Sequence, residues 1–199
     1  MTASEIGRRG GIGMVTVLVA FLAVGCLGRS PSPEHFMLGT ADPVERGDAA
    51  PDVSMLVGPV RLPAYLDRPQ FARLEGHGEV ELDEFARWLG GFEENLLRAL
   101  ALELAERTGS IKITTHPSKA PFSFDARLRL HVDDMVVVGD ALRVRIRWAL
   151  LRTGEEKPPV LAVLDERIPL EGRGNAAIVA AHDRAIERLA AAVTFALTE

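Results

Sequence analysis

The sequence predicts a two-layer α+β domain in which two long amphipathic helices pack on one face of a mixed or antiparallel sheet. Apolar residues recur at helical spacing over 92–107 and 178–196, and they alternate with polar residues in several other segments. The order is strands, helix, strands, helix, which suits one sheet covered by both helices. With 199 residues, 47% of them hydrophobic and 26% charged, the chain is in the range of a single globular domain with its own core.

The N-terminus has the pattern of an export signal. Arg8 and Arg9 precede an apolar run over 12–24, which matches the positive and apolar regions of a signal peptide. The run is shorter than the roughly 20 residues that a transmembrane helix needs, so we expect residues 1–25 to be removed. A short anchor that stays uncleaved is the alternative interpretation.

The only cysteine of the chain follows this run. The stretch Leu22-Ala23-Val24-Gly25-Cys26 resembles the lipobox of bacterial lipoproteins, which implies cleavage before Cys26 and lipidation of its thiol. The next residue is Leu27 rather than Asp, and in lipoproteins of enteric-type bacteria this implies the periplasmic face of the outer membrane. We therefore expect a lipidated tether at 26–34 in front of a domain at 35–199.

The first part of this domain is expected to hold short strands. Alternating or β-branched residues predict strands at 35–38, 54–60, 71–74 and 79–82, and the Pro, Gly and Asp content of 40–52 predicts a loop.

The segment 83–107 is predicted as a helix that is interrupted once. Asp83 would cap its start, Gly90-Gly91 would break or kink it, and Gly109 would stop it. The part after the two glycines carries an apolar stripe, so it is the first long helix of the domain.

A hairpin is the clearest element of the chain. Ile111 and Ile113 mark a short strand before it, and apolar and polar residues then alternate without a break over 122–133. After Gly139-Asp140 the alternation resumes over 142–150, as expected for the second strand of a hairpin.

The parity of this hairpin requires an irregularity. A two-residue loop at Gly139-Asp140 would place the apolar Val132 opposite Arg147, although cross-strand partners share one face of a sheet. We therefore expect a β-bulge near Asp133-Asp134. A further strand is expected at 160–170, and Asn175 is expected to cap the last helix.

Arginines dominate the outward face that this hairpin would have. They alternate with the apolar residues, so they should gather on one face of the sheet: Arg127, Arg129, Arg143, Arg145 and Arg147. Such a cluster could hold phosphate headgroups or an acidic partner surface. The alternative is a solvated face on which Asp125, Asp133 and Glu166 serve as counter-charges.

Motifs of catalysis and of metal or cofactor binding are missing from the sequence, and we expect neither an enzyme nor a cofactor. There is no G-x-S-x-G, H-E-x-x-H, Walker or C-x-x-C motif. His131 and Asp133 share a strand face, but further metal ligands are not evident, and His182 is most simply a packing residue. The net charge of −5 gives no general electrostatic attraction to nucleic acid or to an anionic membrane, so any basic patch must be local.

A proline-rich stretch, Val57 to Gln70 (VGPVRLPAYLDRPQ), is expected to form a rigid turn. Such a turn would display Tyr65, Asp67 and Arg68 to a partner, because rigid aromatic and arginine side chains make good anchors. The alternative is that Tyr65 packs on its own prolines. Pro59 is expected at an edge or a bulge of a strand.

The same stretch resembles the signature of the ABC-type transport auxiliary lipoproteins, the family of paraquat-inducible protein C. The resemblance continues through four further segments, namely Glu84-Phe85-Ala86-Arg87-Trp88, Phe92-Glu93-Glu94-Asn95-Leu96, Arg147-Trp148-Ala149-Leu150 and the Ala/Leu-rich C-terminal helix.

This resemblance implies a non-enzymatic component of a cell-envelope lipid transport system. The implied partners are an MCE-domain (MlaD-like) protein, an ABC permease and an ATPase, and copies of the chain can assemble into a ring that docks on the MCE protein. The alternative from another functional class is a structural envelope lipoprotein without a transporter partner. The two differ in whether genes for a permease, an ATPase and an MCE protein lie beside the gene.

Overall fold

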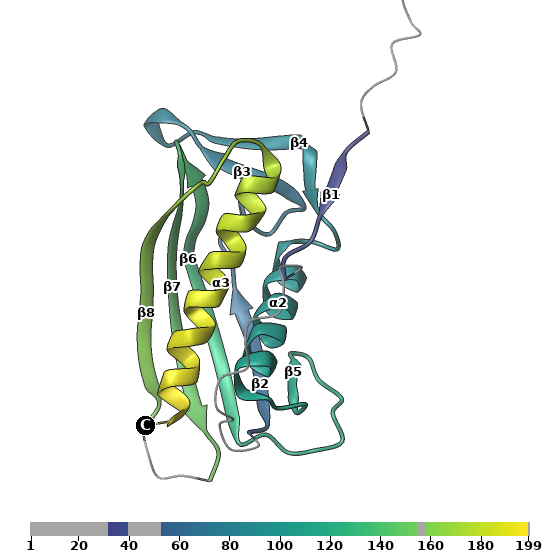
Figure 1. The fold of residues 1–199 in the computed structure, drawn as a ribbon, viewed down its shortest axis with the longest axis vertical. Coiled ribbons are helices and arrows are strands. Elements are labelled where there is room, and N and C mark those ends of the chain that lie inside the picture. Colours follow the sequence, from purple (N-terminus) through teal and green to yellow (C-terminus); the bar gives the residue numbers. More distant parts are fainter. Residues whose placement is uncertain (1–31, 40–52, 155–157, 199) are drawn as a thin grey trace, which may run out of the picture. The chain divides into compact units, whose positions relative to one another are not determined.

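A long antiparallel hairpin lies at the centre of the sheet (Figure 1). In the computed structural model the described residues are 32–39, 53–154 and 158–198. β6 (Ala126–Val138) pairs with β7 (Ala141–Arg152) around the turn at Gly139-Asp140, and β8 (Val160–Pro169) pairs antiparallel with the other side of β7. The predicted hairpin and the strand after it are confirmed.

Five further strands complete one mixed sheet. β2 (Met55–Arg61) runs parallel to the first half of β6, and β5 (Ile113–Thr115) lies parallel on the far side of β2. The end of β6 meets β3 (Gln70–Leu74), which pairs antiparallel with β4 (Val80–Trp88), and β1 (Glu34–Phe36) pairs parallel with β4. The described strands thus form one 8-stranded sheet with parallel and antiparallel pairs. Of the two sheet types that the sequence allowed, mixed or antiparallel, the sheet is mixed.

The β-bulge lies in β6 near Asp133-Asp134, as the parity of the hairpin predicted. Val132 pairs with Ile146, but the next pair joins Asp134 to Arg145, so Asp133 is the additional residue on β6. The inward-facing apolar rows of both strands therefore continue on the same face past the bulge. Pro59 also lies at an irregularity, because the register of β2 on β6 shifts between Val57 and Val60.

The segment at 83–88 is a strand, and the predicted helix start at Asp83 is wrong. Asp83 Oδ1 does accept hydrogen bonds from the backbone N–H groups of Phe85 and Ala86, at 2.8 and 3.1 Å, as a helix cap would. The chain nevertheless stays extended, because β3 and β1 pair with it on both sides. Trp88 is buried, and its ring centroid lies 4.2 Å from that of Phe71. This aromatic packing stabilises the strand conformation.

Two strand boundaries also differ from the prediction. The first hairpin strand begins at Ala126 rather than at residue 122, since Asp125 turns aside to accept hydrogen bonds from the Ser54 backbone and hydroxyl, at 3.1 and 2.6 Å. Phe122 and Phe124 precede the strand and pack against each other edge to face. Ile111 lies outside β5 and is almost fully exposed.

Both long helices cover the same face of the sheet (Figure 1). α2 (Phe92–Thr108) contacts β2 and β5, whereas α3 (Asn175–Thr198) contacts β7 and β8, and the two helices pack against each other. α2 starts directly after Gly91 and ends before Gly109, whose φ of 67° closes the helix in the left-handed conformation. The helix stop predicted at Gly109 is confirmed, whereas Gly90-Gly91 separates a strand from a helix and does not interrupt one helix.

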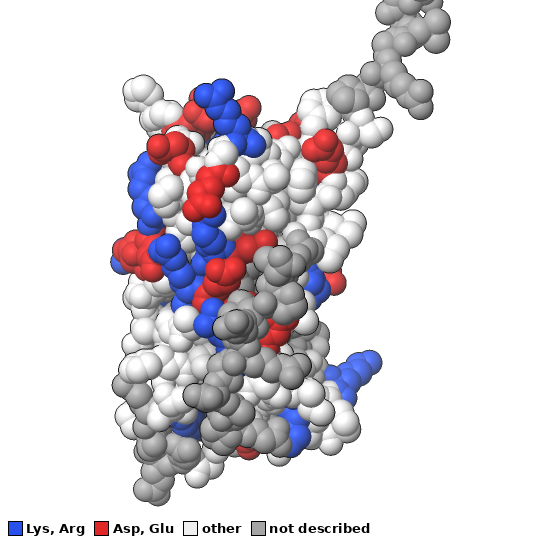
Figure 2. Space-filling model, in the orientation of Figure 1, with Lys and Arg blue, Asp and Glu red and all other residues white. Residues whose placement is uncertain are grey.

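The core fills the space between the helices and the sheet. The sheet supplies the inward residues of the hairpin, and the helices supply their apolar stripes; the fully buried members include Leu96, Leu100, Leu104, Leu128, Val144, Ile146, Leu150, Ala181, Leu189 and Val193. Figure 2 looks onto the face that carries the helices, where acidic and basic groups lie side by side among neutral ones. The charges on this face are mixed in sign, so it presents no field of one sign.

A buried asparagine joins β1 to the start of α2. Asn95 Oδ1 accepts a hydrogen bond from the Leu38 backbone at 3.2 Å, and its Nδ2 donates to the carbonyl oxygens of Leu89 at 2.5 Å and Gly91 at 2.8 Å. One buried side chain therefore ties the backbone at Leu38, just after β1, to the Leu89–Gly91 turn before α2.

His182 is the packing residue that the helix stripe predicted. Its ring lies 5.1 Å from Trp88 and 5.8 Å from Phe92 between centroids, and Nδ1 is 2.8 Å from the Ile178 carbonyl oxygen. Because a carbonyl only accepts, Nδ1 carries the proton and donates it. Burial lowers the pKa of His182 to about 4, so the ring is neutral at pH 7.

Candidate functional site

The face of the sheet opposite the helices carries all five arginines that the alternation placed outward. Leu128 and Leu130 of β6 and Val144 and Ile146 of β7 point to the helices and are buried. The residues between them point away, so the structure gathers Arg127, Arg129, Arg143, Arg145 and Arg147 on one surface. We call this surface the outer face.

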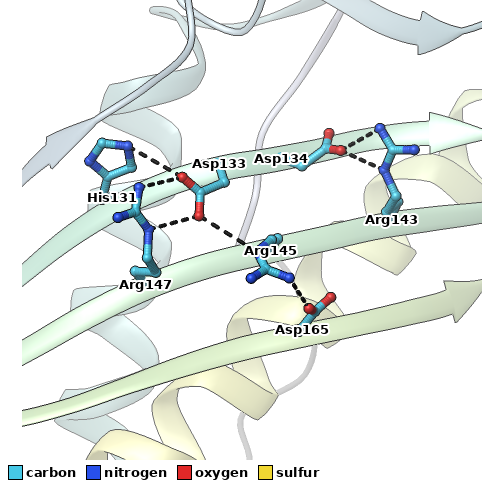
Figure 3. Close-up of polar contacts among 7 residues, drawn as sticks. All are labelled: His131, Asp133, Asp134, Arg143, Arg145, Arg147 and Asp165. Atoms are coloured by element: carbon cyan, nitrogen blue, oxygen red, sulfur yellow. Dashed lines mark hydrogen bonds and ion pairs between the residues drawn. The ribbon is translucent and has the colours of Figure 1, made fainter. Parts of the chain in front are cut away.

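Three of these arginines are bound by aspartates (Figure 3). Arg147 donates two hydrogen bonds to the Asp133 carboxylate, at 2.8 Å from Nε and 2.5 Å from Nη2. Arg143 pairs with Asp134, and Arg145 pairs closely with Asp165. The hydrogen bonds between Arg147 and Asp133 are the largest cause of two pKa shifts: they lower the pKa of Asp133 and raise the pKa of Arg147.

Asp133 is the centre of the network. Besides Arg147 it lies 3.8 Å from Arg145 Nε and 3.4 Å from His131 Nε2. The β-bulge explains this arrangement, because the additional residue on β6 brings Asp133 and Asp134 to the arginines one after the other.

Two of the expected counter-charges are engaged elsewhere. Asp125 binds Ser54, and this hydrogen bond lowers the pKa of the Asp125 carboxyl. Glu166 pairs with Arg188 of α3. Of the three expected carboxylates only Asp133 neutralises the outer face, and Asp134 and Asp165 take the other two places.

Three arginines at one end of the outer face have no ion-pair partner among the residues that the structure describes. Arg127 and Arg129 of β6 are exposed, and Arg61 of β2 is exposed beside them. None of the three forms an ion pair with a residue among those at 32–39, 53–154 and 158–198.

A shallow groove of about 670 Å³ crosses the strands at this end, and we call it the sheet groove. One row of side chains in direct cross-strand register runs over β2, β6, β7 and β8, namely Arg61, His131, Arg147 and Val163. The neighbouring row consists of Arg129, Ala149 and Leu161.

The far end of the sheet groove is apolar and open to solvent. Leu161 is 76% exposed and Val163 is 50% exposed, although both belong to large hydrophobic residue types. They lie on β8, and no strand among the described residues pairs with its other edge. Adjoining exposed apolar side chains with a polar rim are typical of an interaction site.

The proline-rich turn does not present Tyr65 to solvent beside Asp67 and Arg68, contrary to the predicted display. Tyr65 is half-buried against the core, and its hydroxyl donates to Asp134 Oδ1 at 2.9 Å. Burial is the largest cause of a raised pKa at Tyr65, with the Asp134 hydrogen bond second. Tyr65 thus contacts the outer-face network rather than its own prolines alone, while Asp67 and Arg68 are exposed.

Asp67 and Arg68 line a second groove. It has a volume of about 620 Å³ and runs between the turn, the start of α2 and the segment around His116. The structure therefore separates the three residues of the predicted display, because Tyr65 does not line this groove.

Cys26 and the signal segment lie outside the described residues. Among the helices that the structure describes, none is long and apolar enough to cross a membrane. Within the same part of the chain, no group of three or more His, Cys, Asp or Glu side chains could hold a metal ion.

Sequence reasoning missed Arg61, Leu161 and Val163. Arg61 is hidden between prolines, where no alternation gives its direction. In β8 consecutive residues are apolar, as in Leu161-Ala162-Val163-Leu164. Because successive side chains point to opposite faces of a sheet, such a run indicates that both faces of the strand are apolar, including the outer one.

Comparison with known proteins gives a family and a fold. Residues 36–194 match the model of the family described as ABC-type transport auxiliary lipoprotein component. A search among curated proteins found no match.

Two solved structures share the fold. One is the crystal structure of an uncharacterised protein, with 14% identity and a TM-score of 0.64 over 82% of this chain and 97% of the other. The second is a Xanthomonas campestris protein from a family of unknown function, with 13% identity and a TM-score of 0.53 over 82% of this chain and 91% of the other.

Proposed function

Because the chain belongs to the ABC-type transport auxiliary lipoprotein family, we propose that it is the anchored docking component of an ABC system that moves lipids in the cell envelope. Its partners would be an MCE-domain protein, a permease and an ATPase, with several copies of the chain forming a ring. The family description supports an association with an ABC transporter, and the lipid cargo and the MCE partner are the proposed part.

The anchor in this proposal is Cys26. A thiol can carry an acyl-glyceryl group through a thioether, and several acyl chains hold a protein stably on a membrane. Acylation before Leu27 would place the domain on the periplasmic face of the outer membrane. The tether between Cys26 and Glu34 would keep the domain within roughly 30 Å of that surface, because an extended chain spans at most about 3.5 Å per residue.

The outer face is the observation that carries the docking role. Arginine is the charged residue type most enriched at protein interfaces, and this face combines exposed apolar side chains with arginines that form no ion pair with a described residue. The opposite face of the sheet is covered by α2 and α3 and is closed to a partner.

Affinity capture of the full-length lipoprotein from detergent-solubilised membranes tests the proposal. We expect an MCE-domain protein among the captured proteins, and the double charge reversal Arg127→Glu/Arg129→Glu to reduce its recovery at least fivefold. Arg173→Glu is the matched control, since Arg173 is an exposed arginine in the loop between β8 and α3. Repeated capture without any MCE-domain protein would favour a structural envelope lipoprotein instead.

A further inference from the structure

The sheet groove changes from cationic to apolar along its length. Arg61 and Arg129 at the β2 and β6 end are free of ion pairs with described residues, whereas Arg147 at the middle is neutralised by Asp133. Leu161 and Val163 form the other end. Four neighbouring strands at about 4.8 Å spacing put roughly 14 Å between the two ends.

We propose that the sheet groove binds one phospholipid with an anionic headgroup. The phosphate would lie between Arg61 and Arg129, and the first part of an acyl chain would cover Leu161 and Val163. This inference rests on the proposed function, since it names the lipid contact within the transport role. It concerns the groove itself, so it can fail while the docking role stands.

The chemistry of each end fits this ligand. A guanidinium group presents its N–H donors in a planar fork that matches phosphate oxygens, and two such groups can share one phosphate. A volume of about 670 Å³ is in the range of small-molecule sites. It is large enough for a headgroup and the start of a chain.

The separation of charge from apolar surface favours a lipid over an acidic segment of a protein. A peptide that carries carboxylates and apolar side chains along its length would meet free cations at one end of the groove only. A lipid has one anionic end and one apolar end, in the order that the groove presents. Because β8 has no described neighbour on its outer edge, the rest of the acyl chain can leave the groove there.

The test is a titration of the full-length protein, in a constant concentration of a non-ionic detergent, with dioctanoyl phosphatidylglycerol. Binding is measured by calorimetry. We expect saturation near one lipid per chain, at least a tenfold loss of affinity in Arg61→Glu/Arg129→Glu, and a comparable loss in Leu161→Ser/Val163→Ser. Arg173→Glu should bind as the wild type does. All substituted side chains are exposed, so circular dichroism should show unchanged folding.

Further probes identify the source of the affinity. Inorganic phosphate alone should bind at least tenfold more weakly than the lipid, and so should dioctanoylglycerol, which lacks the phosphate. Equal binding of phosphate would mean a simple anion patch, and equal binding of dioctanoylglycerol would mean adsorption to Leu161 and Val163; either result overturns the proposal.

Two more results would also overturn it. One is unchanged lipid affinity in both double variants. The other is an acidic amphipathic peptide that binds in an Arg61-dependent way where the lipid does not, which would make the groove a protein-docking site. Capture of an MCE-domain protein without lipid binding would leave the docking role intact and refute the lipid site alone.

Discussion

His182 is kept neutral by the fold, and this links stability to pH. Burial against Trp88 and Phe92 disfavours the charged ring, whereas the unfolded chain binds a proton with a pKa of about 6.5. The folded pKa is below the unfolded one, so stability is present above about pH 6.5 and falls as the pH drops toward 4. Over that window the loss is at most about 3 kcal/mol.

Replacing His182 should remove this part of the pH dependence. In His182→Leu the free energy of unfolding, measured by urea titration, should fall less between pH 6.5 and pH 4 than in the wild type. The difference arises because only the wild-type unfolded chain gains a proton at this position. Identical pH dependence in the two proteins would contradict the neutral buried ring.

Asn95 is the second residue whose role is precise enough to test. In Asn95→Ala the buried Leu38 N–H loses its hydrogen-bond partner and the turn at Leu89 loses a donor, which should cost about 2 kcal/mol of unfolding free energy. Glu93→Ala, on the exposed side of the same turn, should change it by less than about 0.5 kcal/mol. Equal urea midpoints for the two variants would rule out the proposed tie.

Some residues of the outer face could be predicted from the sequence, and others could not. Strict alternation gives the direction of Arg127 and Arg129 without any tertiary information. Which carboxylates neutralise these arginines depends on the register of the strands and on the packing of the helices. The alternation alone could therefore not exclude Glu166 as a counter-charge, although it pairs with Arg188 of α3.

At the scale of elements, the glycine stop of α2 is a local device that can be measured. Gly109 has a φ of 67°, and no atom lies within 4 Å of a Cβ added there, so Gly109→Ala costs backbone strain alone. We expect about 1 kcal/mol of destabilisation in thermal or urea unfolding. Gly76→Ala is the control, because its position is equally open and has no left-handed φ. A Gly109→Ala protein as stable as the control would show that the stop is not needed.

The hairpin was predictable and β4 was not, for one physical reason. A half-buried strand carries its own period, so the parity mismatch between Val132 and Arg147 is enough to locate the bulge. In β4, Asp83 hydrogen-bonds the next backbone amides much as a helix cap does. The choice of strand depends on β1 and β3, which pair from both sides and are invisible to a local pattern.

At the scale of the whole molecule, the two faces of the sheet have separate tasks. The inner face, on the side of the helices, packs against α2 and α3 and so forms the core of the domain. Neither of the two described helices lies on the outer face, which carries the arginine–aspartate network, the exposed Arg61, Arg127 and Arg129, and the sheet groove. A domain built this way can present one surface to a partner or a lipid without exposing its core.

Native mass spectrometry of the full-length protein, purified by affinity capture from mild detergent, can detect the anchor, the ring and the MCE-domain partner in one experiment. We expect a complex that contains several copies of a chain beginning at an acylated Cys26, together with an MCE-domain protein. The acyl mass reports the anchor, and the stoichiometry reports the ring. A single chain with an unmodified Cys26 still joined to Gly25, and no MCE-domain protein, would contradict the anchored docking role.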